Sequence, residues 1–294
     1  MLLYRMIVAV ICLIFLALET QSQIPSYNCL RVCAPDMIAI DGNLNEPCWA
    51  QADSIRLVDV VTGANDPQPT SVRVLWDSVN LYIGFMASDD LIGATLTRHD
   101  TTLYQQDVVE MFIDPDRNGT DYYELEWNCR NASFDAYVTY SGGSAHPDLS
   151  WDAVDMKSAV SVKGTVNNNA DKDTSWCAEI ALPWKNLTEE TKPAVPVAGG
   201  SMKIGFFRIE LRTSSTIYTS WVPTGAIQFH RPDKFGTLRF GPCAGTDVKK
   251  KSQINGNSAC LQENTACLLP LKKCSFLNGS RSLDLSGRVL LPGN

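Results

Sequence analysis

Apolar and polar positions alternate most regularly in residues 104–128, and this alternation predicts a β-hairpin. Residues 108–113 are mainly β-branched, aliphatic or aromatic, and residues 114–121 are rich in the turn-forming residues Asp, Asn, Gly and Pro. In residues 122–128 apolar and polar side chains alternate, so the returning strand should present one apolar face and one polar face. We expect the apolar face to join the core of a domain.

The polar face of this hairpin carries candidate ligand-binding side chains. Glu124, Glu126 and Asn128 follow one another on it, and Glu110 interrupts the neighbouring apolar strand. Sugars need fixed hydrogen-bonding groups for their hydroxyls and a flat apolar surface for the ring. Acids and amides beside aromatic side chains therefore indicate a sugar-binding surface. An equally open interpretation is a solvated outer face, on which cross-strand ion pairs contribute little stability.

Short strands recur along the chain up to about residue 240. Further strands are predicted at residues 38–40, 71–76, 81–87, 133–140, 158–162, 175–182, 203–212, 218–221 and 236–240. Residues 183–187 predict a single helical turn, whereas residues 23–35 are interpreted as an irregular lead and 141–147 as a break. Strands at a spacing of roughly 8 to 12 residues, without long helical periods, predict an all-β fold. The expected architecture is an antiparallel β-sandwich of jelly-roll or immunoglobulin-like type.

The N-terminus has the layout of a secretory signal peptide. Arg5 precedes an apolar run over residues 6–18, and the polar residues 19–23 follow. Residues 1–22 are therefore predicted to be removed. The apolar run is too short for a comfortable transmembrane helix, and no other stretch of the sequence could cross a bilayer. The mature protein is expected to be secreted, outside the cell or in a secretory compartment, with no membrane partner.

Charge and composition narrow the partners and the domain limits. The formal net charge of −7 argues against a nucleic-acid partner, because phosphate binding needs clustered Lys and Arg. The basic run Lys249–Lys251 is interpreted as a solvated segment. β-Branched and aromatic residues become sparse from Gly241 onward. The sequence therefore predicts one domain over residues 23–241 and an irregular, Cys-containing tail over residues 242–294.

The cysteines and glycosylation sequons agree with secretion. Of the ten cysteines, Cys12 lies in the predicted signal peptide and nine remain. They are Cys29, Cys33, Cys48, Cys129, Cys177 and Cys243 in the main domain, and Cys260, Cys267 and Cys274 in the tail. Disulfides are expected in pairings that the sequence leaves open, and the odd number implies a free thiol or an intermolecular bridge. Sequons predict glycans at Asn118, Asn131, Asn186 and Asn278.

Several short motifs occur together in a fixed order. They are Ile40–Trp49, Ser71–Asp77, Leu81–Tyr82, Asp107–Pro115, Tyr122–Asn128, Glu179–Trp184, Ser220–Trp221 and Lys234–Arg239. Their order resembles that of family 9 carbohydrate-binding modules, over about residues 35–240. The resemblance implies an antiparallel β-sandwich that binds sugars, often at chain ends. It also implies common attachment to xylan- or cellulose-degrading enzymes, and bound calcium is usual in that family.

The resemblance also implies roles for individual residues. In sugar-binding members two Trp side chains clamp the pyranose ring, and the motifs place Tyr104 at the first position and Phe229 near the second. Glu110 matches the acid of the family site, and Glu126 stands where Arg is usual. The predicted ligand-binding set is Tyr104, Glu110, Glu126, Asn128, Arg208 and Phe229. Core packing of Tyr104 and Phe229 is the alternative.

The turn of the hairpin fits the opening of a calcium-binding loop. Asp114, Asp116 and Asn118 follow the pattern Asp-x-Asp-x-Asn-Gly, but Leu125 stands where the closing Glu belongs. Strands rather than helices are predicted on both sides. A hairpin turn is therefore the favoured interpretation, and a weak calcium site is the alternative.

The predicted function is a secreted module that binds an oligo- or polysaccharide, plant-type or matrix, or its chain end, without cleaving it. A glycosidase would need two carboxylates about 5 to 9.5 Å apart, which the acids of the polar face could supply. A haem-binding electron-transfer domain would need a Met and a His, and the candidates are Met86, Met111, His99 and His230. A protein-interaction module with a vestigial sugar face is the remaining alternative.

Overall fold

The computed structural model describes residues 24–187, 196–243, 282–283 and 289–290. The chain divides into two units, Met1–Lys249 and Lys250–Asn294. In the second unit, β15 (Ser282–Leu283) pairs antiparallel with β16 (Val289–Leu290). The predicted signal peptide lies outside the described residues, and so do the sequon Asn278 and the three tail cysteines.

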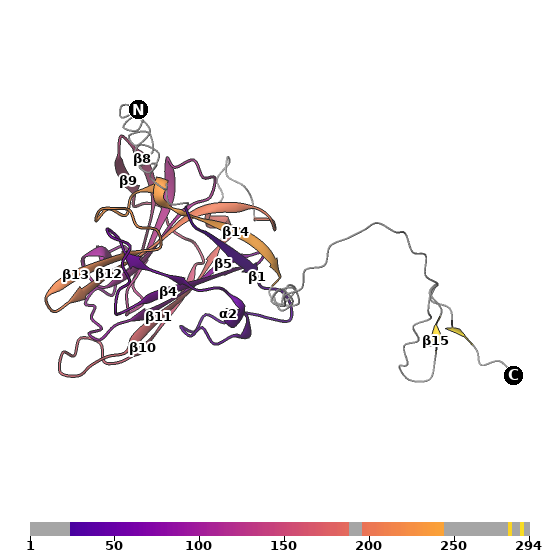
Figure 1. Ribbon diagram of the computed structural model, residues 1–294, viewed down its shortest axis with the longest axis horizontal. Helices are drawn as coiled ribbons and strands as arrows, with labels where there is room; N and C mark the ends of the chain where they lie inside the picture. Colours follow the sequence, from indigo (N-terminus) through magenta and orange to yellow (C-terminus); the bar gives the residue numbers. More distant parts are fainter. Residues whose placement is uncertain (1–23, 188–195, 244–281, 284–288, 291–294) are drawn as a thin grey trace, which may run out of the picture. The chain divides into compact units, whose positions relative to one another are not determined.

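Two layers of strands build the first unit (Figure 1). One layer is antiparallel and contains β10 (Lys157–Lys163), β11 (Ser175–Pro183), β5 (Asn80–Ser88), β4 (Thr70–Trp76) and β2 (Ile55–Arg56). The other follows the order β14 (Gly236–Cys243), β12 (Ser201–Arg212), β6 (Val108–Asp114), β7 (Asp121–Trp127), β8 (Ser133–Ser141) and β9 (Ser144–Asp148). β13 (Ser215–Ser220) joins β12, and β3 (Val58–Asp59) joins β13.

A single strand connects the two layers. β1 (Ser26–Arg31) pairs with β14 through its first residues and with β4 through its last two. Both pairings are parallel, so the sandwich is antiparallel except at this corner. The disulfide between Cys33 and Cys243 joins the chain just after β1 to the end of β14. Segments from opposite ends of the domain are therefore fastened at one place.

The main core lies between the layers. It takes every second side chain of strands on both sides, including Val72, Val74 and Trp76 from β4 and Tyr123, Leu125 and Trp127 from β7. Burying a large apolar side chain contributes about 1.5–3 kcal/mol, so this interleaved cluster dominates the stability of the domain. A sandwich core of alternating inward residues is the arrangement that the sequence pattern predicts.

Helical structure is confined to short pieces between the strands. They are α2 (Pro47–Gln51) and the 3₁₀ turns η1 (Leu103–Gln105), η2 (Trp184–Leu187) and η3 (Pro232–Lys234). Across the described part of the chain, no helix has both the length and the apolar character needed to cross a bilayer.

Most of the predicted strands are confirmed, including the hairpin of β6 and β7 and its two faces. The prediction is wrong at residues 38–40, which form no strand, and at the supposed irregular lead, which contains β1. It is also wrong at residues 141–147, where β9 forms. β9 lies at the edge of the sheet, where Pro147 is tolerated because an edge strand need not donate every N–H.

Arg208 points away from the face on which the sequence analysis placed it. In the register of β12 and β6, Phe207 lies opposite Glu110 and Arg208 lies opposite Val109, so Arg208 faces the interior of the sandwich. It is 1% exposed, its Nη2 lies 2.9 Å from Asp89 Oδ2, and its Nη1 donates to Thr70 and Ser88. Burial raises the pKa of Asp89, and the Arg208 charge opposes that shift.

The described cysteines correct the expectation of several disulfides. Cys33–Cys243 is a disulfide, whereas Cys29, Cys48, Cys129 and Cys177 are buried free thiols. Each of the four lies in the domain interior, where a small sulfur-bearing side chain packs as a hydrophobe. Burial is the largest cause of their raised pKa values. The pKa is about 12 for both Cys129 and Cys177.

We expect Arg208→Ala to destabilise the domain by about 3–5 kcal/mol, because it leaves Asp89 buried without its counter-charge. Arg231→Gln is the control, since the Arg231–Asp233 pair is partly exposed and should contribute less than about 1 kcal/mol. Urea unfolding of both variants measures the difference. Equal losses of stability in the two variants would contradict the interior ion pair.

The buried thiols should resist alkylation in the folded protein. Cys29, Cys129 and Cys177 should stay unmodified by iodoacetamide at about pH 8, because the thiolate is the reactive form and burial suppresses it. The same peptides should be fully modified after unfolding in urea without a reductant, as mass spectrometry can show. Recovery of any of these peptides in disulfide-linked form would refute the assignment.

Candidate functional site

A pocket of about 670 Å³ lies over the face of β6 and β7 that points away from the core. The two strands contribute Glu110, Phe112, Glu124 and Glu126 to it. Loops and neighbouring strands supply the remaining wall, chiefly Asp100, Tyr104, Phe134, Pro147, Leu149, Ile209, Tyr218, Ile227, Phe229 and His230. The predicted polar face is therefore the base of a concave site rather than an open outer face.

Tyr104 is presented to the pocket by the short turn η1. The preceding residue, Leu103, is fully buried and anchors the turn, while Tyr104 is 53% exposed. The backbone of Tyr104 also hydrogen-bonds the carboxylate of Glu126. The alternative that Tyr104 packs in the core is wrong, because its ring is at the surface on the rim of the pocket.

Phe229 forms part of the opposite wall. Its ring stacks on Phe207 with centroids 4.5 Å apart, and its edge contact with Tyr218 has a centroid distance of 6.2 Å. The ring is half-buried and still lines the pocket. Both aromatic residues that the resemblance singled out thus lie at the same pocket as Glu110 and Glu126.

Three glutamates are crowded together in this pocket. Glu110, Glu124 and Glu126 are 2%, 8% and 1% exposed, and each offers a carboxylate oxygen within 4.8 Å of the others. Glu110 and Glu126 are direct cross-strand partners. Glu110 Oε1 and Glu126 Oε2 are buried and have no hydrogen-bond partner. Such a set could hold a cation or share protons.

Burial raises the pKa of all three glutamates, and repulsion adds to the shift at Glu110 and Glu126. Burial raises the pKa of Glu110 well above its ordinary value, and the charges of Glu126 and Glu124 raise it further. Burial raises the pKa of Glu124 to about 7. The pKa of Glu126 is raised by burial and then by Glu124. All three shifts arise because the charged form has lost water without gaining an opposite charge.

His230 closes one side of the pocket as a neutral side chain. Its Nδ1 lies 2.6 Å from the Tyr122 hydroxyl, and its ring stacks on Phe112 at 5.1 Å. Burial lowers its pKa. The sequence analysis did not place His230, Phe112, Phe134 or Tyr218 in the site, because their convergence depends on strand register and loop path. Their aromatic character was the available signal.

Asn128 and Arg208 do not line the pocket, unlike the other predicted ligand-binding residues. The Asn128 side-chain amide already hydrogen-bonds the protein backbone. Its Nδ2 donates to Leu96 O, and its Oδ1 accepts from the backbone N–H groups of Arg130 and Ala132. Arg208 lies on the other face of the sheet. Both residues are therefore assigned structural roles.

The predicted calcium residues form the hairpin turn between β6 and β7, as favoured from the sequence. Asp114 accepts hydrogen bonds from the backbone N–H groups of Arg117 and Gly119, and Asn118 Oδ1 accepts from Thr120. Burial and the neighbouring Asp116 raise the pKa of Asp114 to about 6. The side-chain oxygens of Asp114 and Asn118 thus already accept hydrogen bonds within the turn. Calcium binding at this turn stays a prediction.

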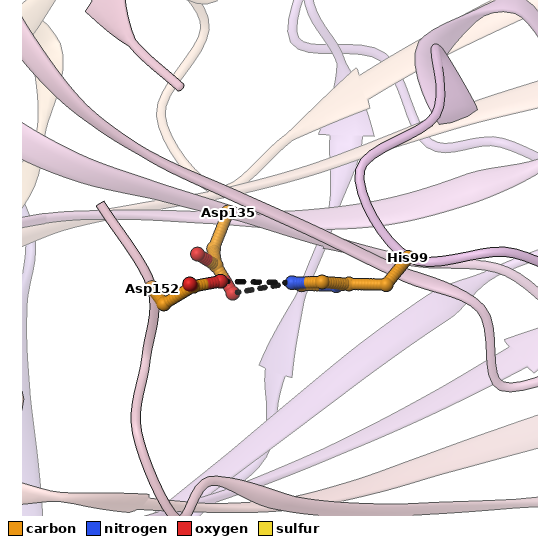
Figure 2. Close-up of side chains that lie close together, drawn as sticks. All are labelled: His99, Asp135 and Asp152. Carbon is orange, nitrogen blue, oxygen red and sulfur yellow. Dashed lines mark hydrogen bonds and ion pairs between the residues drawn. The ribbon is translucent and has the colours of Figure 1, made fainter. Parts of the chain in front are cut away.

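A second acidic cluster surrounds His99, beside the loop that carries Tyr104. Figure 2 shows the His99 ring directed at Asp135 and Asp152. Nε2 lies 3.2 Å from Asp152 Oδ1 and 3.8 Å from Asp135 Oδ2, and Nδ1 lies 3.1 Å from Ser133 O. Burial would lower the pKa of His99, but the carboxylates raise it overall. This donor set could accept a divalent cation, and as an ion pair it ties the loop to β8.

The haem candidates do not come together. Met111 is buried in the core between the layers, whereas His230 lines the pocket on the other face of the sheet. Met86 lies at a separate hollow beside Arg73 and Trp176. The hollow beside Met86 contains no His, and the pocket beside His230 contains no Met.

The sequons differ in accessibility. Asn118 and Asn131 are exposed, so both could carry a glycan on the folded domain. Asn186 is buried, and its Nδ2, the atom that a glycan would occupy, donates to Val154 O. Glycosylation at Asn118 and Asn131 remains a prediction, and the folded structure disfavours it at Asn186.

Comparison with known proteins gives the family. Residues 40–241 match the Carbohydrate family 9 binding domain-like family. Over 202 residues, 68% of this chain, the sequence is 36% identical to Endo-1,4-beta-xylanase A of Thermotoga maritima and 26% identical to that of Thermotoga neapolitana. The matched segments make up 16% and 17% of those two proteins.

A solved structure shares the fold. A candidate carbohydrate-binding protein from Bacteroides uniformis ATCC 8492 superposes with a TM-score of 0.58 at 19% identity, covering 74% of this chain and all of that one. Together with the pocket on the outer face of β6 and β7, the family match over residues 40–241 fixes the assignment. The chain belongs to the Carbohydrate family 9 binding domain-like family and is a carbohydrate-binding module.

Proposed function

We propose that the pocket over β6 and β7 is the saccharide site and that it binds a sugar chain or its end without cleaving it. The observation that carries the proposal is the meeting of Tyr104, Glu110 and Glu126, from residues 104–128, with the remote Phe229 at one pocket. Aromatic rings suit the apolar face of a sugar ring, and the carboxylates suit its hydroxyls. Plant-type and matrix polysaccharides are the ligand classes to test first.

The placement of the carboxylates on two adjacent strands supports binding rather than hydrolysis. The three glutamates offer oxygens within 4.8 Å of one another at one side of the pocket. Retaining glycosidases hold their two carboxyl groups about 5–5.5 Å apart and inverting ones about 6.5–9.5 Å apart, on either side of the bond that breaks. Glu110, Glu124 and Glu126 all project from the adjacent strands β6 and β7 rather than from two sides of a bound chain, which supports a role in recognition.

Two further parts of the proposal rest on the sequence. The N-terminal apolar run supports secretion, and the exposed sequons Asn118 and Asn131 are compatible with it. The matched segment makes up only 16–17% of the two xylanases, so most of each xylanase lies outside the match. Attachment of the module to an enzyme is therefore a property of those proteins. We propose that this chain acts as a secreted binding protein.

Tyr104→Ala should weaken saccharide binding about tenfold, because an aromatic anchor in a binding site typically contributes more than about 1 kcal/mol. Phe229→Ala should weaken it in the same direction. Met37→Ala is the control, since Met37 is 83% exposed and outside the pocket. A glycan array or affinity gel identifies the sugar, and titration calorimetry measures the affinities. Unchanged retention of Tyr104→Ala would remove the ring from the site.

Incubation with the bound oligosaccharide, or with a panel of chromogenic glycosides, should release no product. The proposal predicts the same background rate for the wild type and for Glu126→Gln, because recognition needs no proton transfer. Chromatography of the reaction mixture gives the readout. Release that falls to background in Glu126→Gln would instead establish a glycosidase.

A further inference from the structure

We propose that the sugar bound in this pocket carries a free, positively charged amino group, so that the ligand is a glycan of non-acetylated amino sugars. This inference rests on the proposed saccharide site and adds its ligand class. It is carried by the charge balance of the pocket and by two buried carboxylate oxygens that lack partners.

The pocket gathers acidic side chains that no basic side chain of its lining can neutralise. Four of its lining residues are acids, namely Asp100, Glu110, Glu124 and Glu126, and none of the residues that line it is Lys or Arg. His230 is the one basic side chain among them, and it is held neutral by burial beside Tyr122. A buried charge without a partner is strongly unfavourable, so the acids are either neutralised by protons or matched by a cation.

The unpartnered oxygens favour a ligand that donates several hydrogen bonds from one centre. Glu110 Oε1 and Glu126 Oε2 are buried without partners, and the three carboxylates approach within 4.8 Å of one another. A sugar hydroxyl has a single hydrogen to donate, whereas an ammonium group has three and brings the missing charge. One ammonium therefore suits three convergent carboxylates.

The walls of the pocket suit the remainder of such a ligand. Tyr104, Phe134, Tyr218 and Phe229 line the same pocket as the acids. Aromatic faces attract cations and also stack on the apolar side of a sugar ring. The volume of about 670 Å³ exceeds what a lone metal ion needs and accommodates a sugar ring. An amino sugar satisfies the acids and the walls together.

The experiment compares three oligosaccharides of equal length by titration calorimetry near neutral pH. They are a tetramer of β-1,4-linked glucosamine, the N-acetylated tetramer and cellotetraose, which differ only at the 2-position of each ring. We expect the glucosamine tetramer to bind at least tenfold more tightly than the other two. Glu124→Gln keeps the shape and lowers the negative charge, so it should weaken binding of the glucosamine tetramer at least threefold more than binding of cellotetraose.

Asp53→Asn is the matched control, because Asp53 is exposed and lies outside the pocket. This variant should prefer the glucosamine tetramer as strongly as the wild type does. Circular dichroism confirms folding, and Glu126→Gln replaces Glu124→Gln if the latter unfolds. Equal affinity for all three tetramers overturns this inference and leaves the saccharide site intact. If the protein binds none of the three tetramers and no other glycan on an array, both proposals are overturned.

A divalent cation is the competing occupant of the three glutamates. The titrations are therefore repeated after EDTA treatment and again with calcium chloride alone. Unchanged preference after EDTA supports the ammonium. Calcium binding that Glu124→Gln abolishes, together with loss of sugar binding in EDTA, overturns the inference in favour of a metal site.

Discussion

The strict alternation of side chains along β6 and β7 is the constraint on which the rest of this structure depends. It sends Met111 and Leu125 into the core and holds Glu110 and Glu126 on the opposite face. Because the core packing fixes both strands, the acids cannot rotate into solvent. The stability of one face thus maintains an electrostatically unfavourable arrangement on the other, as binding sites commonly require.

Two groups of buried ionisable side chains in the domain differ in whether an opposite charge lies beside them. Arg208 and Asp89 compensate each other between the layers, with further hydrogen bonds from Arg208 to Thr70 and Ser88. Within that pair, each charge has an opposite charge inside the protein. The glutamates of the pocket have no comparable basic neighbour among the residues that line it. From this contrast we infer that Arg208 and Asp89 stabilise the fold, whereas the pocket glutamates are placed to meet a ligand.

The sequence predicts the sandwich and the central hairpin because these depend on local period and turn chemistry. It also leads to Tyr104, Phe229, Glu110 and Glu126, which line one pocket. It fails for Arg208, since the face of β12 depends on its register against β6 and a shift of one residue exchanges the faces. It misses β1, whose partners β14 and β4 are remote in sequence, and the pairing of Cys33 with Cys243.

Family membership fixes the scaffold more firmly than the ligand. The strands β6 and β7 supply the three glutamates, while the aromatic wall comes from other strands and from loops. The loop that carries Tyr104 is tied to β8 through His99. A change at one outward position of β7, such as the acid Glu126, alters the charge of the pocket without touching the residues between the layers. The fold can therefore be retained while the recognised sugar changes, because site chemistry and core packing occupy opposite faces of the same strands.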